Sequence, residues 1–132
     1  MEDATRREIH TDRAPAAVGP YSQAIEAGGF VYTAGQVGLD PDTGELSGDD
    51  LATQARQAMD NLEAVLGAAG LGMADVVKTT IFLTDVGAFG TVNEIYGDRL
   101  EAPYPARSTV EVSRLPKDAL VEIEAVARRP DG

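Results

Sequence analysis

The sequence predicts an α+β fold, in which one mixed β-sheet carries two helices on one of its faces. Two stretches, 51–69 and 86–100, repeat apolar residues with the period of an α-helix. The stretches around them alternate apolar and polar residues or are rich in β-branched residues, as strands are. The predicted element order is β-β-β-α-β-α-β-β. With 132 residues, the chain is expected to form one domain over 1–132, with 1–13 as an N-terminal segment and 128–132 as a short tail.

The first elements are predicted to form a hairpin. Residues 14–20 contain two prolines and a glycine and indicate a loop. Two short strands, 23–27 and 30–34, follow it, and Gly28-Gly29 joins them with a sequence typical of tight hairpin turns. Residues 35–48 are then expected to form a long connection that contains turns.

The clearest prediction is the first amphipathic helix. Its apolar stripe consists of Leu51, Ala55, Ala58, Met59, Leu62, Val65, Leu66 and Ala69. Residues 47–50 offer an N-cap, and their acids favour the positive end of the helix dipole. Gly70 and Gly72 are expected to stop the helix.

The second half is predicted to add three strands and one helix. Residues 76–84 are rich in β-branched side chains and indicate a central strand. Thr84-Asp85 is expected to cap a helix over 86–100, which cannot continue through the prolines of 103–105. Two strands follow, 107–115 and 121–127, separated by a turn at 115–118.

The alternation of the last two strands assigns side chains to faces. Arg107, Thr109 and Glu111 share one face of their strand, opposite two valines. In the last strand Glu122 and Glu124 lie opposite an apolar face. One sheet face is therefore mixed and charged, and either water or other subunits cover it. The short chain and the single helix layer favour an oligomer.

Composition excludes several classes of function. The net charge is −11, with only 11 basic against 22 acidic residues, so a general nucleic-acid-binding surface is not expected. Cysteine is absent and His10 is the only histidine, so thiol chemistry, a His/Cys metal site and a histidine pair are excluded. No phosphate-binding glycine motif is present, and we expect no cofactor and no metal. The N-terminus does not resemble a signal peptide, and no apolar run could span a bilayer, so a cytoplasmic protein is expected.

Several residues could carry chemistry, and each has a simpler explanation. The guanidinium of Arg107 could bind a carboxylate through two parallel hydrogen bonds, or it could pair with one of the many acids. Glu122 could act as a general base if burial raises its pKa, or it could face water as Glu124 does. Tyr21, Gly35 and Asn93 could line a ligand, or they could serve a turn or a solvated helix face.

Several segments, taken together and in order, resemble the RidA/YjgF family. The resemblance covers about residues 14–127. Its segments are AAVGPYSQA (16–24), YTAGQ (32–36), QARQAMDNL (54–62), VKTTIFL (77–83), PARSTVEV (105–112), LPK (115–117) and VEIEA (121–125).

The resemblance implies a chorismate-mutase-like fold, a homotrimer with pockets between subunits, and a cofactor-independent deaminase. Its substrates would be 2-imino acids or their enamine tautomers, such as 2-iminobutanoate and 2-iminopropanoate, hydrolysed to 2-keto acids and ammonia. By the same resemblance, Arg107 holds the carboxylate, Gly35 forms the pocket wall, Glu122 lies near the attacking water, and Tyr21 and Asn93 line the cleft.

Two substitutions distinguish this chain from many family members. Ala34 stands where many carry serine, and Thr109 stands where many carry cysteine. We include both positions among the expected substrate-binding residues, because they would alter the polarity of the pocket. Two other functions remain open: a trimer that binds keto acids without catalysis, and an endoribonuclease, against which the acidic composition argues.

Overall fold

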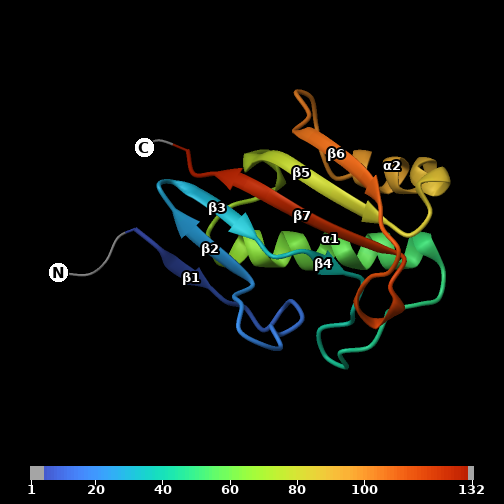
Figure 1. Cartoon of the computed structure of the whole chain (residues 1–132). Helices are drawn as coiled ribbons and strands as arrows, with labels where there is room; N and C mark the ends of the chain where they lie inside the picture. Colours follow the sequence, from blue (N-terminus) through green and yellow to red (C-terminus); the bar gives the residue numbers. More distant parts are fainter. Residues whose placement is uncertain (1–4, 131–132) are drawn as a thin grey trace.

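The computed structural model describes residues 5–130, which form one mixed seven-stranded sheet with two helices packed on one face (Figure 1). The strands are β1 (Arg7–Ile9), β2 (Ala24–Ala27), β3 (Phe30–Thr33), β4 (Gln36–Val37), β5 (Val76–Leu83), β6 (Ala106–Glu111) and β7 (Val121–Arg128). The helices are α1 (Leu51–Ala68) and α2 (Phe89–Gly97), with 3-10 turns at Met73–Asp75, Val86–Ala88 and Pro116–Asp118. The predicted α+β class and the single helix layer are confirmed.

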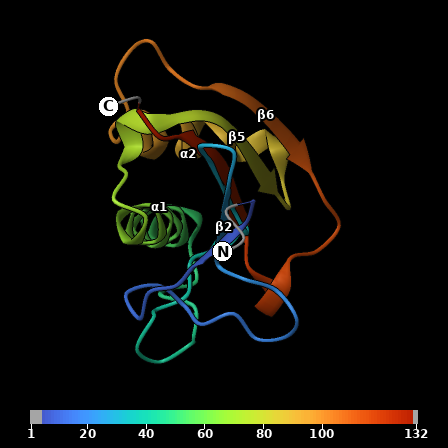
Figure 2. The same ribbon diagram turned by 90° about the vertical axis from the view of Figure 1, so that its left-hand side faces the viewer.

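The sheet order is β1-β2-β3-β7-β5-β6, and the short strand β4 also pairs with β7. All neighbours are antiparallel except β5 and β6, which run parallel because α2 carries the chain back between them. The last strand, β7, thus lies at the centre of the sheet, and β6 lies at its edge. Seen from the side, α1 and α2 form the second layer (Figure 2).

The core lies between the sheet and α1. Ala55, Ala58, Met59, Leu62, Val65 and Leu66, all of the predicted stripe, are buried. Alternate residues of β7 complete the core with Val121, Ile123, Ala125 and Ala127, as predicted, while the intervening residues are half-buried on the opposite face. At the start of α1, the Asp50 carboxylate accepts a hydrogen bond from the Thr53 backbone N–H at 3.0 Å and so caps the helix.

The element order differs from the prediction at two short strands. Four strands, and not three, precede α1, and only β2 and β3 among them fall in the ranges predicted for strands, 23–27 and 30–34. One of the other two is β1, which lies in the predicted N-terminal segment 1–13 and pairs with β2. The other is β4, which lies in the predicted connection 35–48 and pairs with β7. Strands of three and two residues carry too little alternation to be found by pattern, and only their partners hold them.

The later boundaries also shift. The Asp85 side chain accepts from the Gly87 N–H and caps a 3-10 turn, so α2 proper begins at Phe89 and ends at Gly97, shorter than the predicted 86–100. Strand β6 ends at Glu111 and not at residue 115. In the predicted tail, Arg128 still belongs to β7, while residues 131–132 lie outside the described part of the chain.

An ionic cluster ties the two ends of the described chain together. The Glu26 carboxylate on β2 accepts from Arg129 at 2.7 and 2.8 Å and from Arg7 of β1 at 2.6 Å. Arg129 also donates to the Ala69 carbonyl at the end of α1. Chiefly because of the hydrogen bonds from Arg129, the pKa of Glu26 falls from 4.5 to about 2. No helix within residues 5–130 is long and apolar enough to cross a membrane.

Candidate functional site

The first group of predicted site residues gathers where β4 meets β7. Val37 of β4 is the register partner of Glu122 on β7, and Gly35 directly precedes β4. The Glu122 side chain lies against Gly35 so closely that a Cβ on Gly35 would stand 2.6 Å from its Cδ. Only glycine at this position leaves the carboxyl group where it is.

The environment of Glu122 differs from that of a fully solvated acid. Its side chain is partly buried, and within residues 5–130 the structure gives its carboxylate no hydrogen-bond donor. Burial raises the pKa of Glu122, and the neighbouring negative charge of Glu124 raises it further. A carboxylate in this situation is a better proton acceptor than an exposed one.

Tyr21 and Ala34 lie beside this group. Tyr21 is about half exposed and shares with Gly35 the lining of a small hollow of about 60 Å³, which also includes Pro15 and Gln36. Its hydroxyl accepts weakly from the Val18 N–H at 3.4 Å. The N–H of Ala34 is already used by the Gln23 carbonyl at 2.9 Å, so Ala34 offers no free donor and contributes only its small apolar surface.

Arg107 belongs to a second group, at the edge of the sheet. Its guanidinium lies over the ring of Tyr96 on α2, 5.1 Å from the ring centroid. Within the described chain it makes no ion pair, so the alternative of a purely structural pair with a neighbouring acid is not realised there. The side chain is exposed, and its N–H donors are available to an anion.

Thr109 and Asn93 belong to the elements that hold Arg107 and its aromatic neighbour, β6 and α2. Thr109 follows Arg107 by two residues on β6 and therefore projects from the same sheet face. Asn93 lies one helical turn before Tyr96 on α2, which places both on neighbouring positions of one helix surface. The predicted residues thus fall into two groups. We name Tyr21, Ala34, Gly35 and Glu122 the carboxylate group, and Asn93, Arg107 and Thr109 the arginine group.

One chain does not bring the two groups together. Arg107 is the register partner of Thr79 on β5, and the Thr79 side chain points to the helices. Glu122 is the register partner of Phe82 on the same strand. Phe82 follows Thr79 by three residues, so its side chain points to the other face of the sheet. The two side chains therefore leave opposite faces of the sheet. Two strand spacings, about 10 Å, also separate β7 from β6. A small ligand cannot touch both groups of a single chain.

Buried amides hold the loops of the carboxylate group in place, a feature that the sequence analysis missed. Asn61 of α1, fully buried, donates to the carbonyls of Val37 and Leu39 at 3.1 and 2.9 Å and so anchors β4 to the helix. The Gln54 side chain, also buried, donates a hydrogen bond to the Gly48 carbonyl and accepts one from the N–H of Leu120, the residue just before β7. The sequence offered one signal of this role: Gln54 and Asn61 are polar residues that fall on the buried face of the helix, among apolar neighbours.

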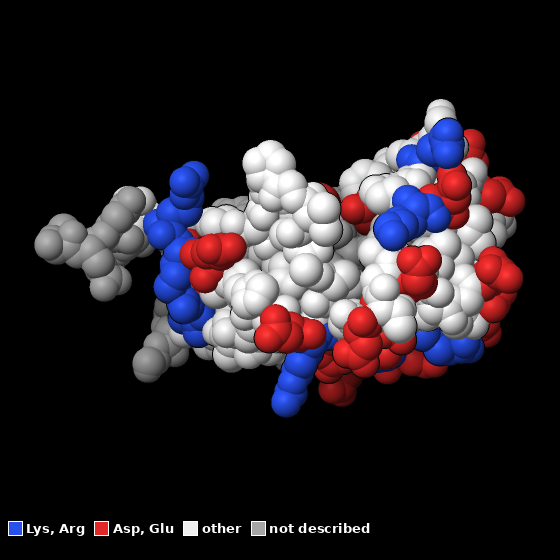
Figure 3. Space-filling view, turned by 90° about the horizontal axis from the view of Figure 1, so that it is seen from below, with Lys and Arg blue, Asp and Glu red and all other residues white. Residues whose placement is uncertain are grey.

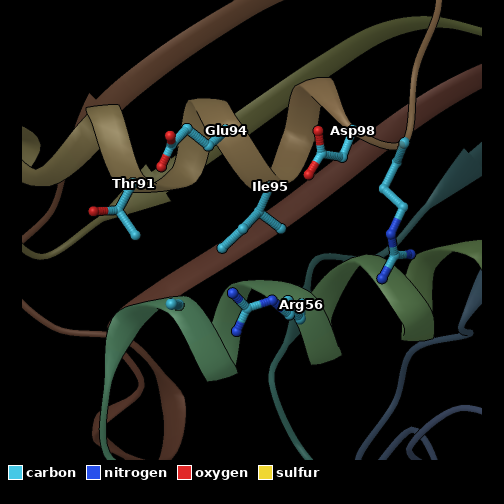
Figure 4. A pocket seen from close by; sticks show the side chains of 7 residues that line it. Arg56, Thr91, Glu94, Ile95 and Asp98 are labelled. Atoms are coloured by element: carbon cyan, nitrogen blue, oxygen red, sulfur yellow. The ribbon is translucent and has the colours of Figure 1, made fainter.

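Hollows larger than the one beside Tyr21 lie elsewhere in the described chain. A groove of about 400 Å³ runs between α1 and α2 (Figure 4), lined by Arg56, Glu94, Ile95, Asp98 and Arg99 among others. None of the predicted site residues lines it. In residues 5–130, no group of three or more His, Asp or Glu side chains is arranged to hold a metal ion.

Comparison with known structures defines the class. The fold is that of a group of small α+β proteins with solved structures. Escherichia coli TdcF with bound serine superimposes with a TM-score of 0.88 and 46% identity over 94% of this chain and 99% of the other. A family model described as Endoribonuclease L-PSP matches residues 11–129.

The chain belongs to this family, the RidA/YjgF family. A RutC family protein of Synechocystis is 56% identical over 96% of this chain and 98% of its own length. The Escherichia coli protein named 2-iminobutanoate/2-iminopropanoate deaminase is 49% identical over 93% of this chain and 98% of its own length. The resemblance predicted from the sequence is confirmed over nearly the whole chain.

Proposed function

We propose that the protein hydrolyses 2-imino acids, among them 2-iminobutanoate and 2-iminopropanoate, to 2-keto acids and ammonia. A relative at 49% identity bears the name of this deaminase, and a structural neighbour was crystallised with serine, a small molecule with one carboxylate. The observation that carries the proposal is the exposed Arg107, a cation without an ion pair in the described chain that can bind such a carboxylate in bidentate fashion.

The chemistry requires no strong nucleophile. A protonated imine carbon is already electrophilic, so the protein needs to fix the carboxylate and position one water molecule. Glu122 accepts a proton from that water as its oxygen bonds to the imine carbon, and the C=N double bond becomes a single bond. Glu122 then returns this proton to the nitrogen of the carbinolamine. The C–N bond breaks as the carbonyl forms, and the hydroxyl proton passes to the departing ammonia, which leaves as ammonium. Water and the iminium ion are thereby converted to keto acid and ammonium, with no net oxidation.

The separation of Arg107 and Glu122 within one chain leads to the assembly that we propose, a homotrimer. The sheet face away from the helices carries apolar side chains, among them Tyr32, which is 48% exposed, and Val110, which is 39% exposed. If the edge strand β6 of one subunit packs against this face of its neighbour, the arginine group of one chain meets the carboxylate group of the next. The number three comes from the resemblance. A cytoplasmic location is likewise proposed from the sequence.

The test is the release of keto acid from 2-iminopropanoate generated in the assay. The wild-type protein is expected to accelerate it, and Arg107→Ala to lower kcat/KM by about 10- to 150-fold, because a hydrogen bond to a charged group contributes about 1.5 to 3 kcal/mol. Arg114→Ala is the matched control, since Arg114 pairs with Asp118 on an exposed turn. Equal rates for wild type and Arg107→Ala would remove the basis of the proposal.

The same samples distinguish the two other functions. Calorimetric binding of 2-ketobutyrate without acceleration of imine decay would indicate a binding protein. Cleavage of single-stranded RNA, lost in Arg107→Ala, would indicate the activity that the family description names. On the face shown in Figure 3, basic side chains gather at one end and are otherwise isolated among acidic ones, and the net charge of −11 disfavours binding of a phosphate backbone. We therefore expect no cleavage.

A further inference from the structure

We infer that Tyr96 is a positioning residue that orients Arg107 for anion binding. The inference rests on the proposed role of Arg107. It starts from the contact already described, in which the guanidinium lies over the Tyr96 ring at 5.1 Å from its centroid. No prediction from the sequence gave Tyr96 a function beyond the apolar stripe of its helix.

Tyr96 is held more firmly than an ordinary core aromatic residue. It is 5% exposed, and its hydroxyl shares a hydrogen bond of 2.7 Å with the hydroxyl of Thr79, which is 1% exposed. Thr79 is itself the register partner of Arg107 on the adjacent strand. The ring is thus fixed at both ends, by its packing in α2 and by its bond to β5, before Arg107 meets it.

The contact with the Tyr96 ring leaves the guanidinium N–H groups of Arg107 available, since none of them donates a hydrogen bond within residues 5–130. A guanidinium stacks through its flat face, while its N–H groups point outward in the plane. A carboxylate binds in that plane, through two parallel N–H···O bonds. An arginine on an exposed edge strand would otherwise sample many rotamers, and ordering it on binding would cost affinity. Tyr96 removes part of this cost, because the guanidinium is oriented in advance.

The inference predicts which property of residue 96 affects binding. It is the negative electrostatic potential of the ring face, and neither its hydroxyl nor its volume. A series of fluorinated phenylalanines at position 96 changes this potential while leaving the shape nearly unchanged. We therefore propose to compare Tyr96→Phe with the 4-fluoro, 3,5-difluoro and pentafluoro analogues, and to measure the dissociation constant for 2-ketobutyrate by calorimetry.

A cation–π contact contributes about 0.5 to 2 kcal/mol, so the pentafluoro variant is expected to bind 2-ketobutyrate about 2- to 30-fold more weakly than Tyr96→Phe, with the partly fluorinated variants in order between them. Tyr96→Phe itself should bind within about threefold of wild type. The single variant Tyr96→Phe leaves the Thr79 hydroxyl buried without a partner. The double variant Thr79→Val/Tyr96→Phe removes both hydroxyls and therefore serves as the control that restores stability.

A neutral probe separates positioning from simple stability. The imine of 2-ketobutyramide has no carboxylate, so its hydrolysis should show no trend with fluorination, whereas KM for 2-iminobutanoate should rise along the series while kcat changes little. A flat dissociation constant across the series would overturn the inference, as would a wild-type protein that does not bind 2-ketobutyrate. A protein that binds with the expected trend but hydrolyses no imine would overturn the proposed function and leave the role of Tyr96 intact.

Discussion

Gly35 and Glu122 are in direct contact: the carboxyl group of Glu122 lies against the α-carbon of Gly35. A Cβ on Gly35 would meet three atoms of Glu122, the carboxyl carbon at 2.6 Å among them, and these are the nearest atoms to it. Since the obstacle is a flexible side chain and not backbone, a larger residue at position 35 must displace the carboxyl group, whereas the fold can remain. This relationship leads to the first prediction.

Gly35→Ala is expected to keep the fold and to lower kcat by about 100-fold, the cost of a misplaced catalytic group. The measurement combines the imine assay with thermal unfolding. Gly67→Ala is the matched control, since no atom lies within 4 Å of a Cβ there, and alanine inside α1 should stabilise the protein by about 0.5 to 1 kcal/mol. A Gly35→Ala protein with normal kcat would show that the position of Glu122 is unimportant.

The pH dependence of activity should report Glu122. Only the ionised carboxylate accepts a proton, so the rate is expected to rise with pH through a pKa that burial and Glu124 hold above the ordinary value. Glu124→Gln removes the neighbouring charge and should move this rise to lower pH. Glu122→Gln should abolish it together with most of the activity. A rise that stays in place in Glu124→Gln would assign it to another group.

The same raised pKa has a consequence for stability. A carboxyl whose pKa is higher in the folded protein than in the unfolded chain costs stability when it ionises. Glu122→Gln is therefore expected to match wild type below the unfolded pKa and to be the more stable protein above the folded one. Urea unfolding at acidic and neutral pH measures the difference. Greater stability of the wild type at neutral pH would contradict it.

Glu26 is predicted to act in the opposite sense. Its pKa of about 2 lies below the ordinary 4.5, so its ionised form contributes stability above pH 4.5, and this contribution disappears as the pH falls toward 2. At pH 7, Glu26→Gln should lose about 1.5 to 3 kcal/mol, the range for hydrogen bonds to a charged group.

Urea unfolding of Glu26→Gln and wild type from pH 7 downward checks this prediction, and the two curves should converge at low pH. Glu63→Gln is the control, because its pair with Arg99 is about half exposed and should contribute less than about 1 kcal/mol. Similar losses in the two variants would mean that the Glu26 cluster is no stronger than a surface ion pair.

Asn61→Leu is predicted to loosen β4. It removes the amide donor that the Val37 and Leu39 carbonyls share. The Val37 carbonyl keeps its bond from the Leu39 N–H, so the expected cost is about 1 to 3 kcal/mol in all, most of it at the Leu39 carbonyl. Faster hydrogen exchange of the β4 amides and a lower kcat should accompany the loss, since β4 pairs with β7 at Glu122. Gln57→Leu, which removes only the donor to Asn61, should have a smaller effect on all three measurements. Equal effects would locate the anchor elsewhere.

The sequence by itself determined the long elements and the family. Helix α1, strands β5 and β7, and the orientation of Glu122 away from the apolar face follow from periodicity, because eight or more residues repeat one pattern. The ordered motifs identified the family, and with it the residues proposed for the site. The short strands β1 and β4 escaped this reasoning, since two or three residues show no period and gain their hydrogen bonds only from distant partners.

Only the tertiary structure decided how the site residues group. Strand order and register place the Glu122 side chain against Gly35 and the Arg107 guanidinium over the Tyr96 ring. They also direct Glu122 and Arg107 to opposite faces of the sheet. Strand order and register arise from contacts between residues far apart in the chain, which local patterns do not encode. Side-chain chemistry could be read residue by residue, but the distances between those side chains are a property of the folded sheet.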